Sequence, residues 1–445
     1  MNGMLKEDLQ YNWHPYTQME ALISNPPLLI EKAQGIKLFS VDGNFYYDTI
    51  SSWWCNIHGH CHPRIVEAVQ QQISRLDHIM FAGFTHEPVI ELSSRLAALT
   101  PKPLERLFYS DNGSTAVETA LKMSVQYWKN TGQSQKNRFI SLDRGYHGDT
   151  VGCMSVSGVD LFVQPFFPLM FHSLKAPSPY CYRCPESKTP SNCSMDCFNE
   201  LEKLLCEHSE TVAGIIIEPI LMGAGGMLIY PADYVSKTAR LAKEYNVHLI
   251  LDEVAVAFGR VGEMFACQLC GVSPDFLCLS KGLTGGILPL AVTMTTREVF
   301  EAFLGPVGSG KTFYHGHTFT GNPIGCAAAI ANLKIFEEEK SLENVKKIAA
   351  RLNSEIEVFA GYEFVGDVRT IGTVLAIELV QNKTSGIPIP NGSEYMRKIY
   401  STGLSNGIIL RAIGNVIYLF LPVCTNENEL SDILARTHAV MKLET

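Results

Sequence analysis

The sequence predicts an α/β protein in which a mostly parallel sheet lies between helices and a smaller α+β unit follows. Residues 213–219, 248–253 and 275–286 are apolar runs that end in charged residues and then in Gly, Pro or a polar break. Such runs are typical of strands buried on both faces, which place their last side chains at the carboxyl edge of a sheet. After Tyr362 the pattern changes to short strands and helices, which indicates a separate unit.

Length and composition indicate a globular protein of the size of an enzyme. The chain has 445 residues, of which 46% are hydrophobic, so it can bury a large core. We expect an N-terminal segment (1–65) that contributes to the small unit and to the active site, a large unit (66–340) and a C-terminal α+β unit (341–445). The net charge of −9 argues against a protein that binds nucleic acid.

The N-terminus and the cysteines favour a cytoplasmic protein. The first ten residues lack a basic start followed by an apolar run, and no uncharged apolar segment reaches the length of a membrane span. The 13 cysteines are an odd number, and several lie in apolar contexts, which is typical of reduced thiols.

Two features stand out near the N-terminus. Alternating residues around Asp42-Gly43 predict a β-hairpin, and Trp53 and Trp54 follow in a stretch without helical periodicity. Adjacent tryptophans of this kind serve packing more often than recognition.

An acid at one strand end and a lysine at the next suggest a specific cofactor. Asp252 closes the run 248–252, and Lys281 follows the run 275–280, directly before a Gly-rich segment. Pyridoxal phosphate fits this pair, because its aldehyde forms a Schiff base with lysine and a carboxylate keeps its ring nitrogen protonated. The pair alone would favour an ordinary solvated acid and base, so the interpretation depends on further matches.

Two turns that lead into helices supply such matches. Gly113 and Ser114 stand between a strand and a helix, where backbone N–H groups and a hydroxyl can hold the phosphate of the cofactor, although Gly-Ser is also simply a good helix cap. Tyr146 follows another strand, and its ring can stack on a flat cofactor.

Two other patterns suggest different chemistry. Cys181, Cys184, Cys193 and Cys197 resemble a four-thiolate zinc site, but a reduced loop that lines a substrate entrance explains them as well, and we expect no metal. Residues 305–312 match the P-loop pattern through Lys311, but a helical pattern precedes them where a P-loop needs a strand.

In order along the chain, the motifs at 111–114, 146–148, 218–219, 252–260, 280–282 and 316–318 resemble those of class III pyridoxal-phosphate aminotransferases of fold type I. The resemblance covers essentially the whole chain and implies a seven-stranded sheet. Residues 13–17, 51–59, 146–150 and Arg411 are similar to the branch of that class that aminates 8-amino-7-oxononanoate in biotin synthesis.

By this resemblance, Lys281, Asp252 and Tyr146 are the catalytic residues, and the enzyme is a homodimer with shared active sites. The resemblance implies that the cofactor is held by Gly113, Ser114, Tyr146, Asp252, Lys281 and, from the neighbouring subunit, His317 and Thr318. The substrates are expected to contact Tyr16, Trp53, Tyr146, Lys281, Gly316 and Arg411.

The sequence departs from the family pattern after Glu253, where Val254–Ala257 replace residues that usually end in Thr-Gly, and this change can reshape the pocket of the cofactor ring. The amino donor is expected to be S-adenosylmethionine, with lysine as the alternative. Another class III aminotransferase for ω-amino acids, diamines or ornithine, an aminomutase, and a P-loop nucleotide-binding protein remain as alternatives.

Overall fold

The computed structural model describes residues 3–189, 192–390 and 394–443. Within these ranges the largest sheet has seven strands in the order β4-β12-β11-β10-β7-β5-β6. Its strands are β4 (Leu104–Ser110), β5 (Arg138–Leu142), β6 (Leu174–Ala176), β7 (Val212–Ile217), β10 (His248–Asp252), β11 (Phe276–Leu279) and β12 (Ala291–Thr296). Because β12 alone runs antiparallel to its neighbours, the expectation of a mostly parallel seven-stranded sheet is confirmed.

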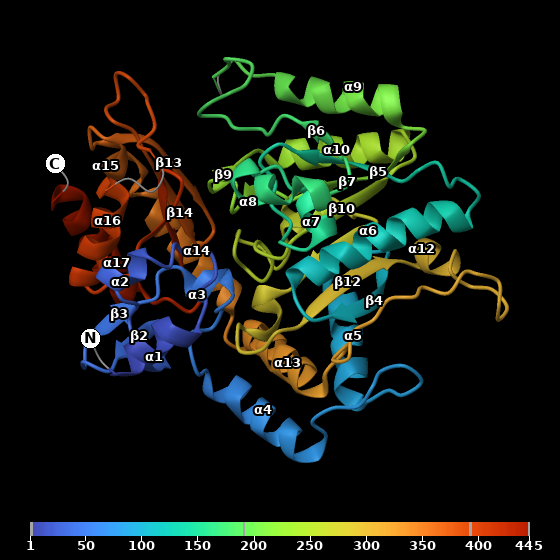
Figure 1. Cartoon of the computed structure of the whole chain (residues 1–445), viewed down its shortest axis with the longest axis horizontal. Coiled ribbons are helices and arrows are strands. Elements are labelled where there is room, and N and C mark those ends of the chain that lie inside the picture. Colours follow the sequence, from blue (N-terminus) through green and yellow to red (C-terminus); the bar gives the residue numbers. More distant parts are fainter. Residues whose placement is uncertain (1–2, 190–191, 391–393, 444–445) are drawn as a thin grey trace.

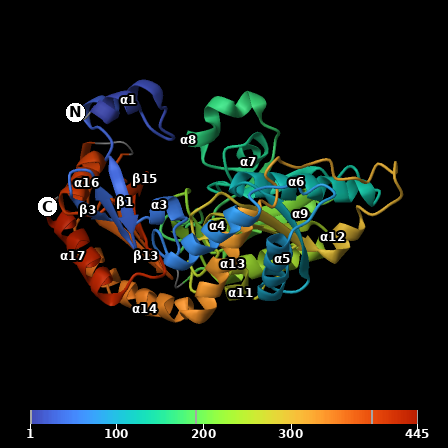
Figure 2. The same cartoon turned by 90° about the horizontal axis from the view of Figure 1, so that it is seen from below.

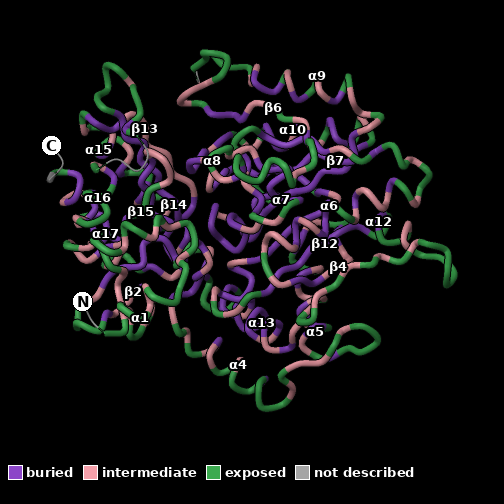
Figure 3. The backbone as a smooth tube through the Cα atoms, viewed as in Figure 1, coloured by how far each residue is buried: buried purple, intermediate pink, exposed green. Residues whose placement is uncertain are grey.

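Helices cover both faces of this sheet (Figure 1) because its strands are apolar on both sides. Successive side chains of a strand point to opposite faces. Ile216 and Ile250 therefore join the core under α6 (Gly113–Asn130), and Ile215 and Leu249 join the larger core that includes Tyr234 of α10 (Ala232–Glu244). The strands β7, β10 and β11 are buried along their whole length, as Figure 3 shows for the interior of this part.

A second part of the molecule combines the two ends of the chain. Figures 1 and 2 show the blue N-terminal strands beside the red and orange C-terminal elements. Its sheets are β1 (Ile30–Gln34), β2 (Lys37–Ser40) with β3 (Phe45–Tyr47), and β13 (Val365–Ile371), β14 (Val374–Leu379), β16 (Val416–Phe420) with β15 (Arg411–Ile413). One hydrophobic core holds Ile36 and Tyr47 together with Leu375 and Leu430. The predicted division at residues 65 and 340 stays a prediction.

The remaining helices connect or cover these sheets. They include α1 (Gly3–Tyr11), α2 (Ala21–Ser24), α3 (Ser51–Trp54), α4 (Pro63–Arg75), α5 (Glu87–Leu99), α7 (Val151–Val156), α8 (Asp160–Val163), α9 (Asn199–His208), α11 (Ala266–Leu269), α12 (Arg297–Glu301), α13 (Pro323–Glu338), α14 (Ser341–Asn353), α15 (Ile356–Ala360), α16 (Glu394–Ser405) and α17 (Glu427–Leu443). In the described part of the chain, no helix combines the length and the apolar character that crossing a membrane requires.

Two local expectations can be compared directly with the structure. The hairpin around Gly43 is confirmed, because β2 pairs antiparallel with β3 across that turn. The P-loop pattern lacks its structural context: α12 separates β12 from residues 305–312, and the next helix, α13, begins only at Pro323. Lys311 therefore does not lie between a buried strand and a helix N-terminus, which a phosphate-binding P-loop requires.

Candidate active site

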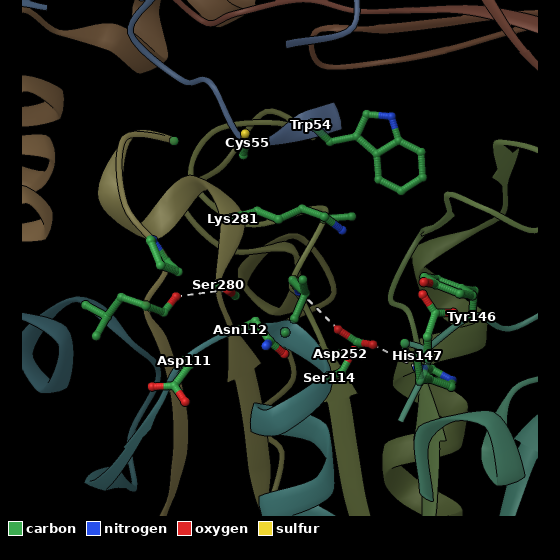
Figure 4. A pocket seen from close by; sticks show the side chains of 18 of the residues that line it. Trp54, Cys55, Asp111, Asn112, Ser114, Tyr146, His147, Asp252, Ser280 and Lys281 are labelled. Carbon is green, nitrogen blue, oxygen red and sulfur yellow. Dashed lines mark hydrogen bonds and ion pairs between the residues drawn. The ribbon is translucent and has the colours of Figure 1, made fainter. Parts of the chain in front are cut away.

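Asp252 and Lys281 meet at the carboxyl edge of the sheet because they end adjacent parallel strands. Asp252 is the last residue of β10 and lies opposite Cys278 of β11, and Lys281 follows β11 after Ser280. Both line a cavity of about 600 Å³. Figure 4 shows the side chain of Lys281 between Trp54 and Asp252. The edge of an open α/β sheet is a common place for ligands.

The carboxylate of Asp252 is held in a fixed orientation. Its Oδ2 lies 2.8 Å from Nδ1 of His147, and its Oδ1 accepts a hydrogen bond of 3.1 Å from the backbone N–H of Val254. Both side chains are buried, at 0% exposure for His147 and 5% for Asp252. His147 is part of the sequence motif 146–148, but its contact with the carboxylate of Asp252 was not predicted, because only the fold brings residues 147 and 252 together.

Lys281 has the environment of a reactive amine. Burial lowers the pKa of Lys281, and the nearby carboxylate of Asp252 only partly offsets this effect. Its Nζ lies 4.8 Å from the centre of the Trp54 ring. A lysine with a lowered pKa supplies the neutral amine that a nucleophile or a base needs.

Glu218 is a site residue that the sequence analysis missed. It follows β7, is 4% exposed and lines the same cavity, and burial raises its pKa to about 8. Its carboxyl group accepts hydrogen bonds from the backbone N–H groups of Tyr146 at 2.9 Å and Gly223 at 3.0 Å. The signal was present, because residues 213–218 are an apolar run that ends in an acid, as residues 248–252 are.

Gly113 and Ser114 begin α6 at the wall of the cavity. Asn112 caps the helix by accepting a hydrogen bond from the N–H of Thr115. There is little space here: a Cβ atom on Gly113 would lie 2.6 Å from Cγ1 of Val254, and one on Gly148 would lie 2.0 Å from Oγ of Ser114. The altered stretch after Glu253 therefore shapes the site through contact between Val254 and Gly113.

A second cavity, of about 860 Å³, continues from the first, and both are lined by Trp54, Tyr146 and Lys281. Tyr16, Trp53 and Arg411, which were expected to contact substrates, also line it. The structure thus brings these three residues together with Tyr146 and Lys281, which were expected to be catalytic, and the lining comes from both parts of the molecule.

Aromatic contacts fix the wall of the second cavity. The hydroxyl of Tyr16 donates a hydrogen bond of 2.6 Å to Asp149 and lies 3.3 Å from the hydroxyl of Tyr146. Burial and the contact with Asp149 raise the pKa of Tyr16 to about 12. The rings of Tyr16 and Trp53 meet edge to face at 5.6 Å, and the guanidinium of Arg411 lies 5.5 Å from the Trp53 ring. Arg411 has no carboxylate partner among the described residues.

Gly316, His317 and Thr318 do not line either cavity. His317 does come near, since its Nδ1 lies 2.8 Å from Oδ2 of Asp111, which lines the first cavity. The expected contact of Gly316 with the substrates, and the expected contribution of His317 and Thr318 to the site of a neighbouring subunit, stay predictions.

Cys181, Cys184, Cys193 and Cys197 line a separate cavity of about 150 Å³. All four are free thiols. In the part of the chain that the structure describes, no group of three or more potential ligand side chains is arranged to hold a metal ion.

The first cavity fits pyridoxal phosphate, the cofactor expected from the sequence. The helix start at Gly113 and Ser114 offers N–H groups and a hydroxyl to an anion, and Gly148 leaves room beside Ser114 that a side chain would fill. Asp252 presents a fixed carboxylate, Lys281 an amine and Tyr146 an aromatic ring to the same space. The residues thus match the phosphate, ring nitrogen, aldehyde and ring face of the group.

Comparisons with known proteins agree with this geometry. The family model "Aminotransferase class-III" matches residues 19–441. The adenosylmethionine-8-amino-7-oxononanoate aminotransferase of Geobacter sulfurreducens is 42% identical, covering 95% of this chain and 94% of that protein. The corresponding protein of Aquifex aeolicus is 43% identical, covering 96% and 95%.

Solved structures extend the comparison. The crystal structure of the adenosylmethionine-8-amino-7-oxononanoate aminotransferase of Methanocaldococcus jannaschii superposes with a TM-score of 0.94 at 42% identity, covering 99% of this chain and 98% of that one. The omega transaminase of Pseudomonas jessenii in complex with PMP has a TM-score of 0.94 at 32% identity, covering 100% and 98%. The chain therefore belongs to the class III aminotransferases, a family of enzymes that depend on pyridoxal phosphate.

Proposed function

We propose that this enzyme transfers an amino group from S-adenosylmethionine to 8-amino-7-oxononanoate and forms 7,8-diaminononanoate, a step of biotin biosynthesis. The names of the relatives that are about 40% identical over nearly the whole chain support this choice. The observation that carries it is the second cavity, which is lined by Lys281, by aromatic side chains and by Arg411, whose guanidinium has no carboxylate partner among the described residues. The acceptor has a long apolar chain that ends in a carboxylate, which matches that arrangement.

The residues of the chain divide the work of the reaction. Pyridoxal phosphate, when bound, supplies an electron sink for the negative charge that develops at the reacting carbon of the substrate. Lys281 would bind the aldehyde group in the resting enzyme and, once displaced by the amino donor, would move a proton as general base and acid. Its lowered pKa favours both roles.

Asp252 would keep the ring nitrogen protonated. A carboxylate that is 5% exposed and held by His147 needs no reorganisation during the reaction, which makes its electrostatic effect large. Gly113 and Ser114 would hold the phosphate, and Tyr146 would stack on the ring and touch the substrate. Glu218 fixes the backbone of Tyr146 and so sets the position of that ring.

At the other end of the cavity, Arg411 would grip the carboxylate of the acceptor in a bidentate manner, and Tyr16 and Trp53 would pack against its apolar chain. Tyr16 is itself held by Asp149. The reaction then has two half-reactions in one cavity, so we expect ping-pong kinetics.

A spectral titration tests this function. Purified yellow enzyme is mixed with S-adenosylmethionine or, separately, with lysine, and the visible absorbance of the bound cofactor is followed. We expect one donor to bleach this absorbance and 8-amino-7-oxononanoate to restore it, which would also identify the donor. If 8-amino-7-oxononanoate fails and another keto compound restores the absorbance, the biotin assignment is wrong.

An amine transaminase for other substrates is the second candidate. The omega transaminases superpose with the same TM-score of 0.94 as the enzyme from Methanocaldococcus jannaschii, although at 32% identity. Such an enzyme would share Lys281 and Asp252. It would be identified by bleaching with simple amines and recovery with small keto acids.

We also propose a homodimer with shared active sites. Exposed apolar side chains at Met80, Phe84, Val307, Tyr314 and Phe319 support an interface on the side of the chain that carries His317 and Thr318. Chains with Lys281→Ala and chains with Thr318→Ala are expected to be poorly active by themselves. Hybrid dimers should regain activity, because one of their two sites combines an intact lysine with an intact threonine. No recovery would exclude sharing through Thr318.

A further inference from the structure

Four consecutive residues in the wall of the active site have left-handed backbone conformations. The φ angles are 50° at Ser51, 45° at Ser52, 72° at Trp53 and 73° at Trp54, and none of these residues is glycine. Left-handed conformations are unfavourable for residues with a Cβ atom and normally occur singly. Residues in such conformations persist only where the surrounding structure determines them, and they cluster at functional sites.

Asp48 makes two of the hydrogen bonds that hold this turn. Its Oδ1 accepts the backbone N–H of Ser52 at 2.9 Å, and its Oδ2 accepts the hydroxyl of Ser52 at 2.7 Å and lies 2.8 Å from Nε2 of His60. Asp48 is 1% exposed. Burial raises its pKa, but the hydrogen bonds from His60 and Ser52 outweigh this effect and hold the pKa below its ordinary value. The residue is therefore an anion inside the protein.

His60 connects this carboxylate to the rest of the fold. The backbone N–H and C=O groups of His60 bond to Gly35, at 2.6 Å and 3.1 Å, and the N–H of Asp48 donates to the C=O of Ile36 at 2.8 Å. The strands β1 and β2 flank Gly35 and Ile36. Asp48 and His60 thus anchor the turn to the first sheet.

The turn places the side chains of Trp53 and Trp54 in the walls of the two cavities. Trp54 points inward, with its ring 4.8 Å from Nζ of Lys281 and its Nε1 3.3 Å from the hydroxyl of Tyr418. Trp53 is 41% exposed and stands between Tyr16 and Arg411. With ordinary backbone angles the two rings would leave these positions, so the conformation of the turn decides the shape of the substrate cavity.

We propose that Asp48 is a positioning residue for substrate recognition, which acts by holding residues 51–54 in the left-handed turn that places Trp53 and Trp54. It touches neither cavity itself. This inference rests on the proposed function for the identity of the acceptor, but not for the role of the turn.

Glycine substitution gives a specific test, because glycine adopts left-handed angles without steric penalty. In Asp48→Ala, we expect the KM for 8-amino-7-oxononanoate to rise about tenfold, which corresponds to the preference of one residue against the left-handed region, with a smaller effect on kcat. In the background of Ser52→Gly, the same Asp48→Ala substitution should raise KM by only about threefold. Asp48→Asn, which keeps the shape and one acceptor, should be intermediate.

Asp432→Ala is the matched control. Asp432 accepts a hydrogen bond from Tyr47, the neighbour of Asp48, but makes no bond to residues 51–54. Both alanine variants are expected to lower the unfolding temperature, and only Asp48→Ala should change KM. The proposal is wrong if Asp48→Ala lowers stability like Asp432→Ala and leaves KM unchanged, or if Ser52→Gly gives no rescue.

The failure of the proposed function would look different. If wild-type enzyme does not use 8-amino-7-oxononanoate, the effect is measured in the half-reaction with whichever amino donor bleaches the cofactor. The dependence of that bleaching on donor concentration reports on the same cavity. A rise of its apparent KM in Asp48→Ala, and rescue by Ser52→Gly, would still support the positioning role, and their absence would refute it.

Discussion

Gly113→Ala should weaken cofactor binding, because the new methyl group has no room at the start of α6. Its Cβ would lie 2.6 Å from Cγ1 and 3.1 Å from Cγ2 of Val254. Carbon atoms pack at about 3.5–4.0 Å, so the helix start or Val254 must move by about 1 Å. Val254 is β-branched and has few alternative rotamers, so we expect the helix start to move.

The magnitude follows from two effects. Overpacking costs about 1–3 kcal/mol, which is a moderate loss of stability in the apo-protein. A shift of the helix start also misaligns the N–H groups that we propose for the phosphate. One hydrogen bond to a charged group contributes about 1.5–3 kcal/mol, so the Kd for pyridoxal phosphate should rise about 10- to 100-fold.

The assay is a titration of the apo-protein with pyridoxal phosphate, followed by absorbance, together with thermal unfolding of the apo-protein. Val254→Ala removes both crowding methyl groups and leaves a Cβ contact of 3.4 Å, so the double variant should regain most of the affinity. Val254→Ala alone is the control. Wild-type affinity in Gly113→Ala, or no recovery in the double variant, would refute the reasoning.

Three further predictions concern single residues. Asp252→Asn should lower turnover far more than cofactor affinity, which single-turnover kinetics and a binding titration separate, and equal losses in both would contradict its proposed role. Glu218→Gln should change the pH dependence of apo-protein stability: burial raises the pKa of folded Glu218 from 4.5 to about 8, so the folded state binds more protons between these values and loses stability as pH rises. Denaturant unfolding should show that the free energy of unfolding falls less across this pH range in Glu218→Gln than in the wild type. An equal fall in both proteins would contradict the raised pKa of Glu218. Arg411→Ala should raise the KM for 8-amino-7-oxononanoate by about tenfold or more and should change the KM for the amino donor less. An unchanged KM for 8-amino-7-oxononanoate would contradict the proposed binding of its carboxylate by Arg411.

The sequence was sufficient wherever a local pattern has one structural solution. Apolar runs that end in a charge predicted strands buried on both faces, and these strands are β7, β10 and β11. Because parallel strands end at one edge, the pattern also predicted that Asp252 and Lys281 would meet there. It likewise made a P-loop at Lys311 a minor alternative, because a helical pattern precedes the motif, and the structure shows that the flanking elements of a P-loop are missing.

Other features depend on contacts between distant segments, which no local pattern encodes. The bond of His147 to Asp252 joins residues 105 positions apart, and the crowding of Gly113 by Val254 exists only because α6 starts beside the end of β10. The tertiary structure likewise decided the conformation of residues 51–54. Their sequence indicated a non-helical stretch, whereas Asp48 and His60 stabilise a left-handed turn that local backbone preferences oppose.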